Sequence, residues 1–291
     1  MIPYDKLYIY EIDGRVKRGD NTFPPDYIGT WWEGEHSFLF FSQEEDGVIQ
    51  SLLKDDPALH LIDRFTISYR DWQGGDEIGP IRVGRLVFVP SWLDLSPVTD
   101  EILITLDPSV VFGTGLHPTT RSCLEGVWTL YEKERPQTVL DLGTGTGILA
   151  LACAKLGADR ILAVDCNPLA VKTAKKNVSL NKEDGRVAVI EGNAEDLIRE
   201  PGDLVCCNLH HEVLDRLLCA DAFFQKRWSL LSGFLKRETE NIVQRLRREG
   251  VCPEIISKQE PWQTILGFNP SVEVSQSLSH VSESREQGMG V

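Results

Sequence analysis

Short apolar runs and longer amphipathic segments alternate through the second half of the chain. The amphipathic segments have the spacing of helices, and the apolar runs have the length of buried strands. Strands that alternate with helices predict a parallel sheet covered by helices on both faces. We therefore expect an α/β domain over residues 107–269, with strands at 139–142, 161–165, 187–191, 203–208 and 262–266 and helices at 121–131, 148–156, 168–180 and 212–218.

The first part of the chain has a different pattern. Strand-like apolar runs occur at Leu7–Ile12 and Ser37–Ser42, and Val48–Leu53 is typical of a short helix. This mixture predicts a small α+β domain over residues 1–60.

Two further segments complete the organisation. Residues 61–106 are interpreted as a linker, in which Pro80–Pro90 forms a strand pair or an extended connector. Residues 270–291 are rich in Ser, Glu, Gln and Gly and contain few large apolar side chains, so this tail is predicted to be disordered.

Charge and cysteine usage exclude several classes of function. A formal charge of −14 over 291 residues argues against direct nucleic-acid binding, in which Lys and Arg neutralise phosphates. The charge is compatible with a basic protein partner, or with solubility alone. The seven cysteines lack zinc or disulfide spacing, which predicts reduced thiols and no metal. No apolar stretch approaches the ~20 residues of a membrane span, and no secretory signal is visible, so we expect a cytoplasmic protein without a membrane partner.

A glycine-rich loop is the strongest chemical signal. Asp141 ends an apolar run, and Gly143, Gly145 and Gly147 follow at every second position before a helix begins. Glycines let the backbone approach a ligand closely, and open α/β sheets bind ligands beyond the carboxyl ends of their strands. Asp165 ends the next apolar run, where an acid suits the hydroxyl pair of a ribose.

The spacing of this loop bears on the choice of nucleotide. Dinucleotide sites carry G-x-G-x-x-G, whereas the pattern here is G-x-G-x-G. The Asp141 carboxylate would repel a pyrophosphate but would attract the ammonium of a methionine moiety. We therefore predict S-adenosylmethionine as the cofactor; a dinucleotide or a ligand-free turn are the alternatives.

A second motif, Phe112-Gly-Thr-Gly-Leu-His-Pro-Thr-Thr120, precedes an amphipathic helix. It could fold over the methionine end of the cofactor. Thr119 and Thr120 also lie where a plain helix N-cap would lie. His117 is either a structural hydrogen-bonding group or a catalytic base.

Amide and imidazole side chains follow two further strands. Asn208 ends an apolar run, where its amide could hold a substrate nitrogen or the carboxylate of the cofactor. His210 and His211 follow it, and one of them could accept a proton, although exposed surface histidines are the simpler interpretation. Asn193 could meet the adenine amino group through its carbonyl oxygen, or could be a turn residue.

Several of these segments together resemble one known family, the ribosomal protein eleven methyltransferases (PrmA). The resemblance covers roughly residues 70–268 and is carried by Pro80–Gly84, Pro90–Trp92, Phe112–Thr120, Asp141–Gly147, Asp165–Pro168, Asn208–Leu209 and Ser232–Lys236. It implies a class I methyltransferase domain, with a Rossmann-like, mostly parallel sheet of seven strands, preceded by a small substrate-recognition domain. It also implies S-adenosylmethionine contacts at Thr120, Gly143, Asp165 and Asn208.

The implied reaction is methylation of lysine side chains and an α-amine on a basic ribosomal protein. Leu116 and the segment 72–80 depart from the family pattern, which bears on the substrate more than on the cofactor. Another protein's lysines or a small molecule are therefore alternative substrates, and a non-catalytic cofactor-binding protein is the alternative of another class. For the reaction itself, we expect Asn208 to position the substrate and His117 to be the second candidate.

Overall fold

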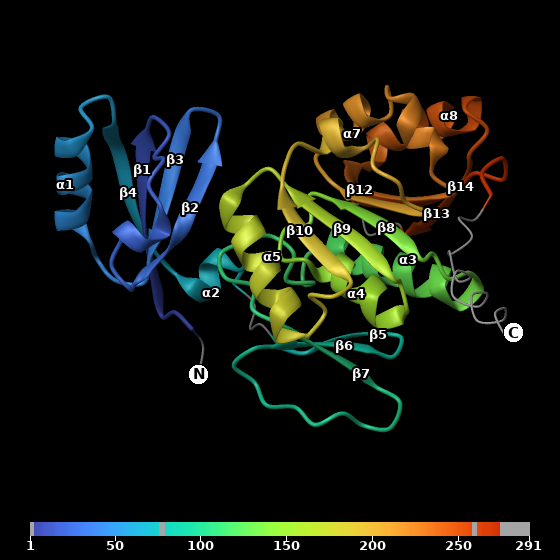
Figure 1. The fold of residues 1–291 in the computed structure, drawn as a ribbon, viewed down its shortest axis with the longest axis horizontal. Helices are drawn as coiled ribbons and strands as arrows, with labels where there is room; N and C mark the ends of the chain where they lie inside the picture. The colour runs from blue at the N-terminus through green and yellow to red at the C-terminus, as the bar shows by residue number, and fades with distance from the viewer. Residues whose placement is uncertain (1–2, 76–78, 258–260, 274–291) are drawn as a thin grey trace, which may run out of the picture.

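The computed structural model of the chain describes residues 3–75, 79–257 and 261–273, which form three β-sheets (Figure 1). One sheet lies at the N-terminus, one small sheet follows it, and a seven-stranded sheet forms the centre of the larger domain. Most of the tail expected to be disordered, residues 274–291, lies outside the described part of the chain.

The large sheet has the strand order β10-β9-β8-β11-β12-β14-β13. All neighbouring pairs from β10 to β12 are parallel, and β14 is antiparallel to both of its neighbours. The parallel strands therefore place their carboxyl ends at one edge of the sheet. The strands are β8 (Thr138–Leu142), β9 (Arg160–Asp165), β10 (Val187–Glu191), β11 (Leu204–Asn208), β12 (Trp228–Leu235), β13 (Cys252–Ser257) and β14 (Trp262–Phe268).

Helices cover both faces of this sheet, and each face has its own buried core (Figure 1). Apolar side chains of α3, α4 and α5 belong to one core, and those of α6, α7 and α8 belong to the other. The helices are α3 (Pro118–Lys133), α4 (Ile148–Leu156), α5 (Pro168–Leu180), α6 (Ala194–Leu197), α7 (His211–Leu217) and α8 (Lys236–Arg248).

The predicted α/β class is confirmed, and the elements around the glycine loop have the predicted bounds to within a residue or two. Strands β12 and β13 and helix α8 were not predicted from the sequence. Most of α8 is charged, and only Thr239, Ile242, Val243 and Leu246 are buried, so its apolar stripe is narrow. Tertiary packing rather than a strong local pattern therefore places this helix.

The N-terminal sheet is fully antiparallel, with the order β2-β3-β1-β4. Helix α1 (Asp46–Asp55) packs on one face through Ile49 and Leu52. The strands are β1 (Lys6–Asp13), β2 (Tyr27–Glu33), β3 (His36–Phe41) and β4 (His60–Ser68), and a 3-10 turn, η1 (Asp20–Thr22), precedes β2. The expected boundary at residue 60 is too early, because β4 pairs with β1 and extends this sheet to residue 68. Most of β4 is exposed, so the run lacks a buried face that would mark it as a strand.

The connector contains α2 (Tyr69–Trp72) and the small sheet of β5 (Ile81–Val83), β6 (Leu86–Pro90) and β7 (Ile102–Leu106). Strands β5 and β6 form the expected antiparallel pair, and β7 runs parallel to β6. Apolar side chains of all three strands join the core formed by α3 and α4. The connector is therefore an integral layer of the larger domain.

The N-terminal sheet packs against the larger domain through β2 and α5. Gly29 lies so close to α5 that a Cβ there would be 2.4 Å from Leu169 Cδ1. Lys172 Nζ donates to the Ile28 carbonyl at 3.1 Å and pairs with Asp20 at 2.6 Å. The two domains thus share a buried cluster that includes Ile28 and Leu169.

Candidate functional site

The glycine loop joins β8 to α4 at the carboxyl edge of the sheet. Gly143 and Gly145 have φ values of 74° and 56°, which favour glycine. A Cβ at Gly143 would lie 2.2 Å from Leu209 Cδ2, and one at Gly145 would lie 2.5 Å from the Phe112 carbonyl oxygen. These two glycines therefore allow Leu209 and Phe112 of the same chain to pack closely against the loop. The contact with Phe112 holds the second motif against it. Gly147, the third, begins α4 with φ 83°.

Asp165 lies at the end of β9 and fixes this loop. Its Oδ2 accepts from the Gly145 N–H at 3.0 Å, and its Oδ1 accepts from the Asn167 N–H at 3.0 Å. Burial raises the pKa of the Asp165 carboxyl. The carboxylate keeps further acceptor positions, since its two oxygens offer about four lone pairs. A half-buried acceptor pair at this place fits the ribose hydroxyls of a nucleoside.

Asp141 lies in β8, just before the loop, and is only 1% exposed. The Thr144 hydroxyl donates to its Oδ2 at 2.6 Å, and burial raises the pKa of Asp141 to about 6. The carboxylate expected to attract an ammonium is thus buried and already accepts a hydrogen bond from Thr144.

Asn208 and Thr120 are brought together from β11 and α3, 88 residues apart, and Asn208 Nδ2 donates to Thr120 Oγ1 at 3.4 Å. Thr120 is buried, and Asn208 is half-buried. The second motif reaches the glycine loop beside them, because the Thr146 hydroxyl donates to the Gly113 carbonyl at 2.7 Å. The glycine loop and the second motif therefore pack against each other as one unit.

His117 is the N-cap residue of α3. Its Nδ1 accepts from the Thr119 N–H at 3.3 Å and lies 2.8 Å from the Thr119 hydroxyl. Burial lowers the pKa of His117, which favours the neutral ring. An accepting Nδ1 puts the proton of the neutral ring on Nε2, which leaves that nitrogen without a basic lone pair. The structure therefore assigns capping to His117, and Thr119 and Thr120 lie inside the first turn.

Sequence reasoning missed Trp262, the first residue of β14. The Trp262 ring lies 5.3 Å from the His117 ring, which lies 5.1 Å from the Phe112 ring. Three aromatic rings from two distant segments thus form one wall beside the second motif. The late strand was predicted, but its antiparallel insertion beside β12, which brings Trp262 here, had no sequence signal.

The remaining candidates lie at the ends of β10 and β11. Asn193 is exposed and caps α6, and its Oδ1 accepts from the Glu195 N–H at 2.9 Å. The oxygen expected to meet an adenine is thus already engaged by the backbone. His210 is exposed and precedes α7, and its ring lies 4.4 Å from that of His211.

No group of three or more His, Cys, Asp or Glu side chains in residues 3–75, 79–257 and 261–273 is arranged to hold a metal ion. Among the helices of the same residues, none has the length and apolar character that crossing a membrane requires.

The strand order with one antiparallel insertion, and the glycine loop between β8 and α4, define a class I methyltransferase fold. The crystal structure of ribosomal protein L11 methylase from Lactobacillus delbrueckii subsp. bulgaricus has this fold and superposes with a TM-score of 0.57. It is 28% identical to this chain, and the match covers 66% of this chain and 98% of that one.

The chain belongs to the ribosomal protein L11 methyltransferase (PrmA) family, whose model matches residues 37–269. A ribosomal protein L11 methyltransferase of Desulfitobacterium hafniense is 34% identical over 74% of this chain and 73% of its own length. One from Anoxybacillus flavithermus is 37% identical over 63% of this chain. The first curated relatives are matched over only about three-fifths of their own length, at 59% and 60%.

Proposed function

We propose that this protein transfers methyl groups from S-adenosylmethionine to amines of a protein substrate, and that the substrate is ribosomal protein L11. The observation that carries the proposal is the convergence of Asp165, the Asn208–Thr120 pair and the second motif at one edge of the sheet. The names of the relatives in the same family support the choice of substrate.

The residues that would hold the cofactor follow from this geometry. Asp165 has free acceptor positions for ribose hydroxyls, and the backbone of Gly143 and Gly145 borders the same site. Asn208 and Thr120 offer polar groups at the neighbouring strand end, and Asp141 supplies negative charge from below. When bound, S-adenosylmethionine supplies an electrophilic methyl group on its sulfonium.

The aromatic wall of Phe112, His117 and Trp262 is suited to an acceptor amine. An amine must be neutral to act as a nucleophile, and deprotonating a lysine of pKa ~10.4 at pH 7 costs about 4.6 kcal/mol. Apolar surroundings lower an amine pKa and offset part of this cost. The neutral His117 adds no positive charge that would oppose the sulfonium, and Asn208 can orient the amine through its carbonyl oxygen. Water then carries the released proton away.

The surface charge agrees with a basic protein substrate. The net charge of −14 favours approach of a basic protein by electrostatic steering. The same charge opposes direct binding of nucleic acid. We place the reaction in the cytoplasm, where ribosomal proteins are made.

Methyl transfer to purified ribosomal protein L11 with radiolabelled cofactor tests the proposal. We expect labelled L11 with the natural sequence and a rate at least about tenfold lower for Asn208→Ala. The amine nitrogen becomes positively charged as the methyl is transferred, and losing a hydrogen bond to a charged group costs about 1.5–3 kcal/mol. Asn21→Ala, an exposed asparagine on η1, is the matched control and should keep the full rate. Absence of label on L11, with label on another protein or a small molecule, would contradict the proposed substrate.

A further inference from the structure

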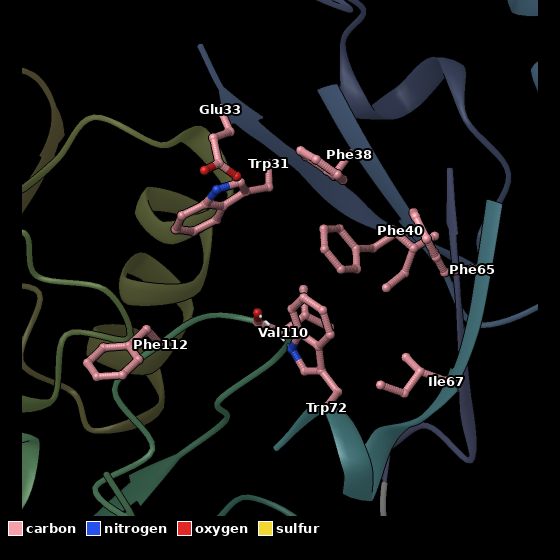
Figure 2. Close-up of a pocket in the computed structure, with 10 residues that line it drawn as sticks. Trp31, Glu33, Phe38, Phe40, Phe65, Ile67, Trp72, Val110 and Phe112 are labelled. Carbon is pink, nitrogen blue, oxygen red and sulfur yellow. Dashed lines mark hydrogen bonds between the residues drawn. The ribbon is translucent and has the colours of Figure 1, made fainter. Parts of the chain in front are cut away.

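A cavity of about 540 Å³ lies between the N-terminal sheet and the segment after β7 (Figure 2). No residue of the glycine loop lines it, and Phe112 is the one lining residue that has a role in the site proposed above. Its walls are mainly aromatic: Trp31, Phe38, Phe40, Phe65, Trp72 and Phe112. Figure 2 shows these side chains arriving from β2, β3, β4, α2 and the segment of Val110 and Phe112.

Glu33 is the single charged residue among those that line the cavity. It lies at the end of β2, is exposed, and sits beside Trp31 in Figure 2. Within the described part of the chain, no cationic side chain pairs with it. The cavity therefore offers aromatic faces and one carboxylate.

Among the residues that line the cavity, Glu33 is the only one whose side chain accepts hydrogen bonds. The Trp72 indole N–H is already engaged, because it donates to the Val110 carbonyl at 3.1 Å. Phe40 packs edge-on against Trp72, with ring centroids 5.2 Å apart, so these walls are fixed by mutual packing. The N–H groups of a ligand would accordingly find few acceptors in this cavity.

This combination discriminates between cations. A primary ammonium has three N–H donors and would leave most of them unpaired among aromatic rings, which costs free energy. A trimethylammonium has no N–H groups, is apolar at its surface and still carries a positive charge. Aromatic faces attract such a cation through their quadrupoles, and a carboxylate adds direct attraction. A neutral apolar side chain would also fit the rings, but it would gain nothing from Glu33.

We propose that this cavity is a binding site for a trimethylated amine, held by the aromatic rings of Trp31 and Trp72 with Glu33 as the counter-charge. The inference rests on the proposed function, because three successive methyl transfers to the nitrogen of one lysine generate such a group. Phe112 lines the cavity and also contacts His117 of the aromatic wall, so the two sites adjoin. A methylated side chain that leaves the acceptor site can thus be retained while another amine of the same substrate enters.

Calorimetric titration of the full chain, without cofactor, tests this site with three small probes. The probes are acetylated and amidated trimethyl-lysine, the same compound of lysine, and the neutral isostere in which carbon replaces the trimethylated nitrogen. We expect trimethyl-lysine to bind at least about fivefold more tightly than either of the other two, in the range of measured cation–π contributions. Equal affinity for the carbon isostere would show an apolar anchor site instead, and equal affinity for lysine would exclude recognition of methylation. No binding of trimethyl-lysine at millimolar concentration would also overturn the proposal.

Charge-neutral variants locate the site. Glu33→Gln should weaken trimethyl-lysine binding by about threefold or more, since it removes the counter-charge and leaves the rings in place. Glu35→Gln is the matched control: it makes the same change of charge on the same hairpin, but Glu35 faces Arg15 at 3.8 Å and does not line the cavity. Equal effects of the two substitutions would mean that general surface charge, not this cavity, attracts the cation.

Trp31→Leu is a second test of the site, because it replaces an aromatic face by an apolar side chain and should reduce binding at least as much. The failures of the two proposals are distinguishable. Methyl transfer to L11 without binding of trimethyl-lysine contradicts only the cavity site. Binding of trimethyl-lysine without methyl transfer to any amine contradicts only the proposed activity.

Discussion

Asp141 shows how one buried carboxylate makes stability depend on pH. Burial raises its folded-state pKa to about 6 from the ordinary 3.8, so the folded protein binds this proton more tightly than the unfolded chain. Ionisation therefore costs folding free energy: the cost is absent below the unfolded pKa, grows as the pH rises, and is complete above about 6. A shift of this size corresponds to about 3 kcal/mol.

We predict that Asp141→Asn removes this part of the pH dependence. The free energy of unfolding of the variant, relative to the natural protein, should rise by about 2 kcal/mol between pH 4 and pH 7, since only the natural protein ionises in this window. Urea unfolding at a series of pH values measures the difference. Parallel stability curves for the two proteins would contradict a buried, ionising Asp141. Cofactor affinity should fall in the same variant if the charge below the loop attracts an ammonium.

Substitutions of His117 distinguish a capping role of this residue from a catalytic role. An asparagine side chain can make the same bond to the N–H two residues on, as Asn167 does at the start of α5. We therefore expect His117→Asn to methylate at a rate within about tenfold of the natural protein, whereas loss of a general base costs about 10²–10⁴-fold. Initial rates with labelled cofactor decide between the two. His117→Ala, which lacks a cap, should unfold more easily by about 1 kcal/mol.

Among the site residues, those whose positions follow from local structure could be predicted from the sequence. Asp165 and Asn208 end apolar strands, so their places at the carboxyl edge follow once the sheet is parallel. Trp262 could not be found, because its contact with His117 depends on where an antiparallel strand inserts. Asp141 lies near the end of β8, as the apolar run predicted, but its burial and its hydrogen bond from Thr144 could not be predicted from the sequence.

At the scale of elements, the glycine loop and the second motif act as one unit. We predict that Gly145→Ala destabilises the protein by at least about 1–2 kcal/mol, because a left-handed backbone disfavours a Cβ and the Phe112 carbonyl occupies its space. Cofactor binding should weaken strongly as well, since the loop must move away from Asp165. Gly185→Ala is the control, because its Cβ would meet open space. Unfolding and calorimetry on both variants check this; equal behaviour would mean that the two segments are not coupled.

Elements with strong local signals were predicted with accurate bounds, and those without them were not. Helices α4 and α5 begin and end at the predicted residues. Gly147 marks the start of α4, and the Asn167 cap followed by Pro168 marks the start of α5. Strand β4 was missed because its side chains are mostly exposed, so no alternation of burial marks it. Its pairing with β1 becomes apparent only from the folded sheet.

At the scale of the whole molecule, hydrogen bonds join α2, which directly follows the last strand of the N-terminal sheet, to the segment after β7 of the larger domain. Tyr69, at the start of α2, donates from its hydroxyl to the Ser109 carbonyl at 2.6 Å. The indole N–H of Trp72 donates to the carbonyl of Val110, the residue that follows Ser109. Two residues further along, Phe112 enters the site itself. None of these contacts was visible in the sequence, because they join residues that are 40 and 38 positions apart.

We predict that Tyr69→Phe affects the protein substrate but not the cofactor. Gln73 still donates to the Ser109 carbonyl, so no acceptor is left unpaired, and one hydrogen bond of about 0.5–1.5 kcal/mol is lost. A less firmly held N-terminal sheet should raise the KM for ribosomal protein L11 by about 2–10-fold, while the Kd of the cofactor stays within about twofold. Tyr27→Phe removes a comparable hydroxyl, bonded to Thr30 at 2.6 Å, entirely within the N-terminal sheet. An equal rise in KM for both variants would show that general loosening of that sheet, rather than its attachment to the segment of Ser109, governs substrate recognition.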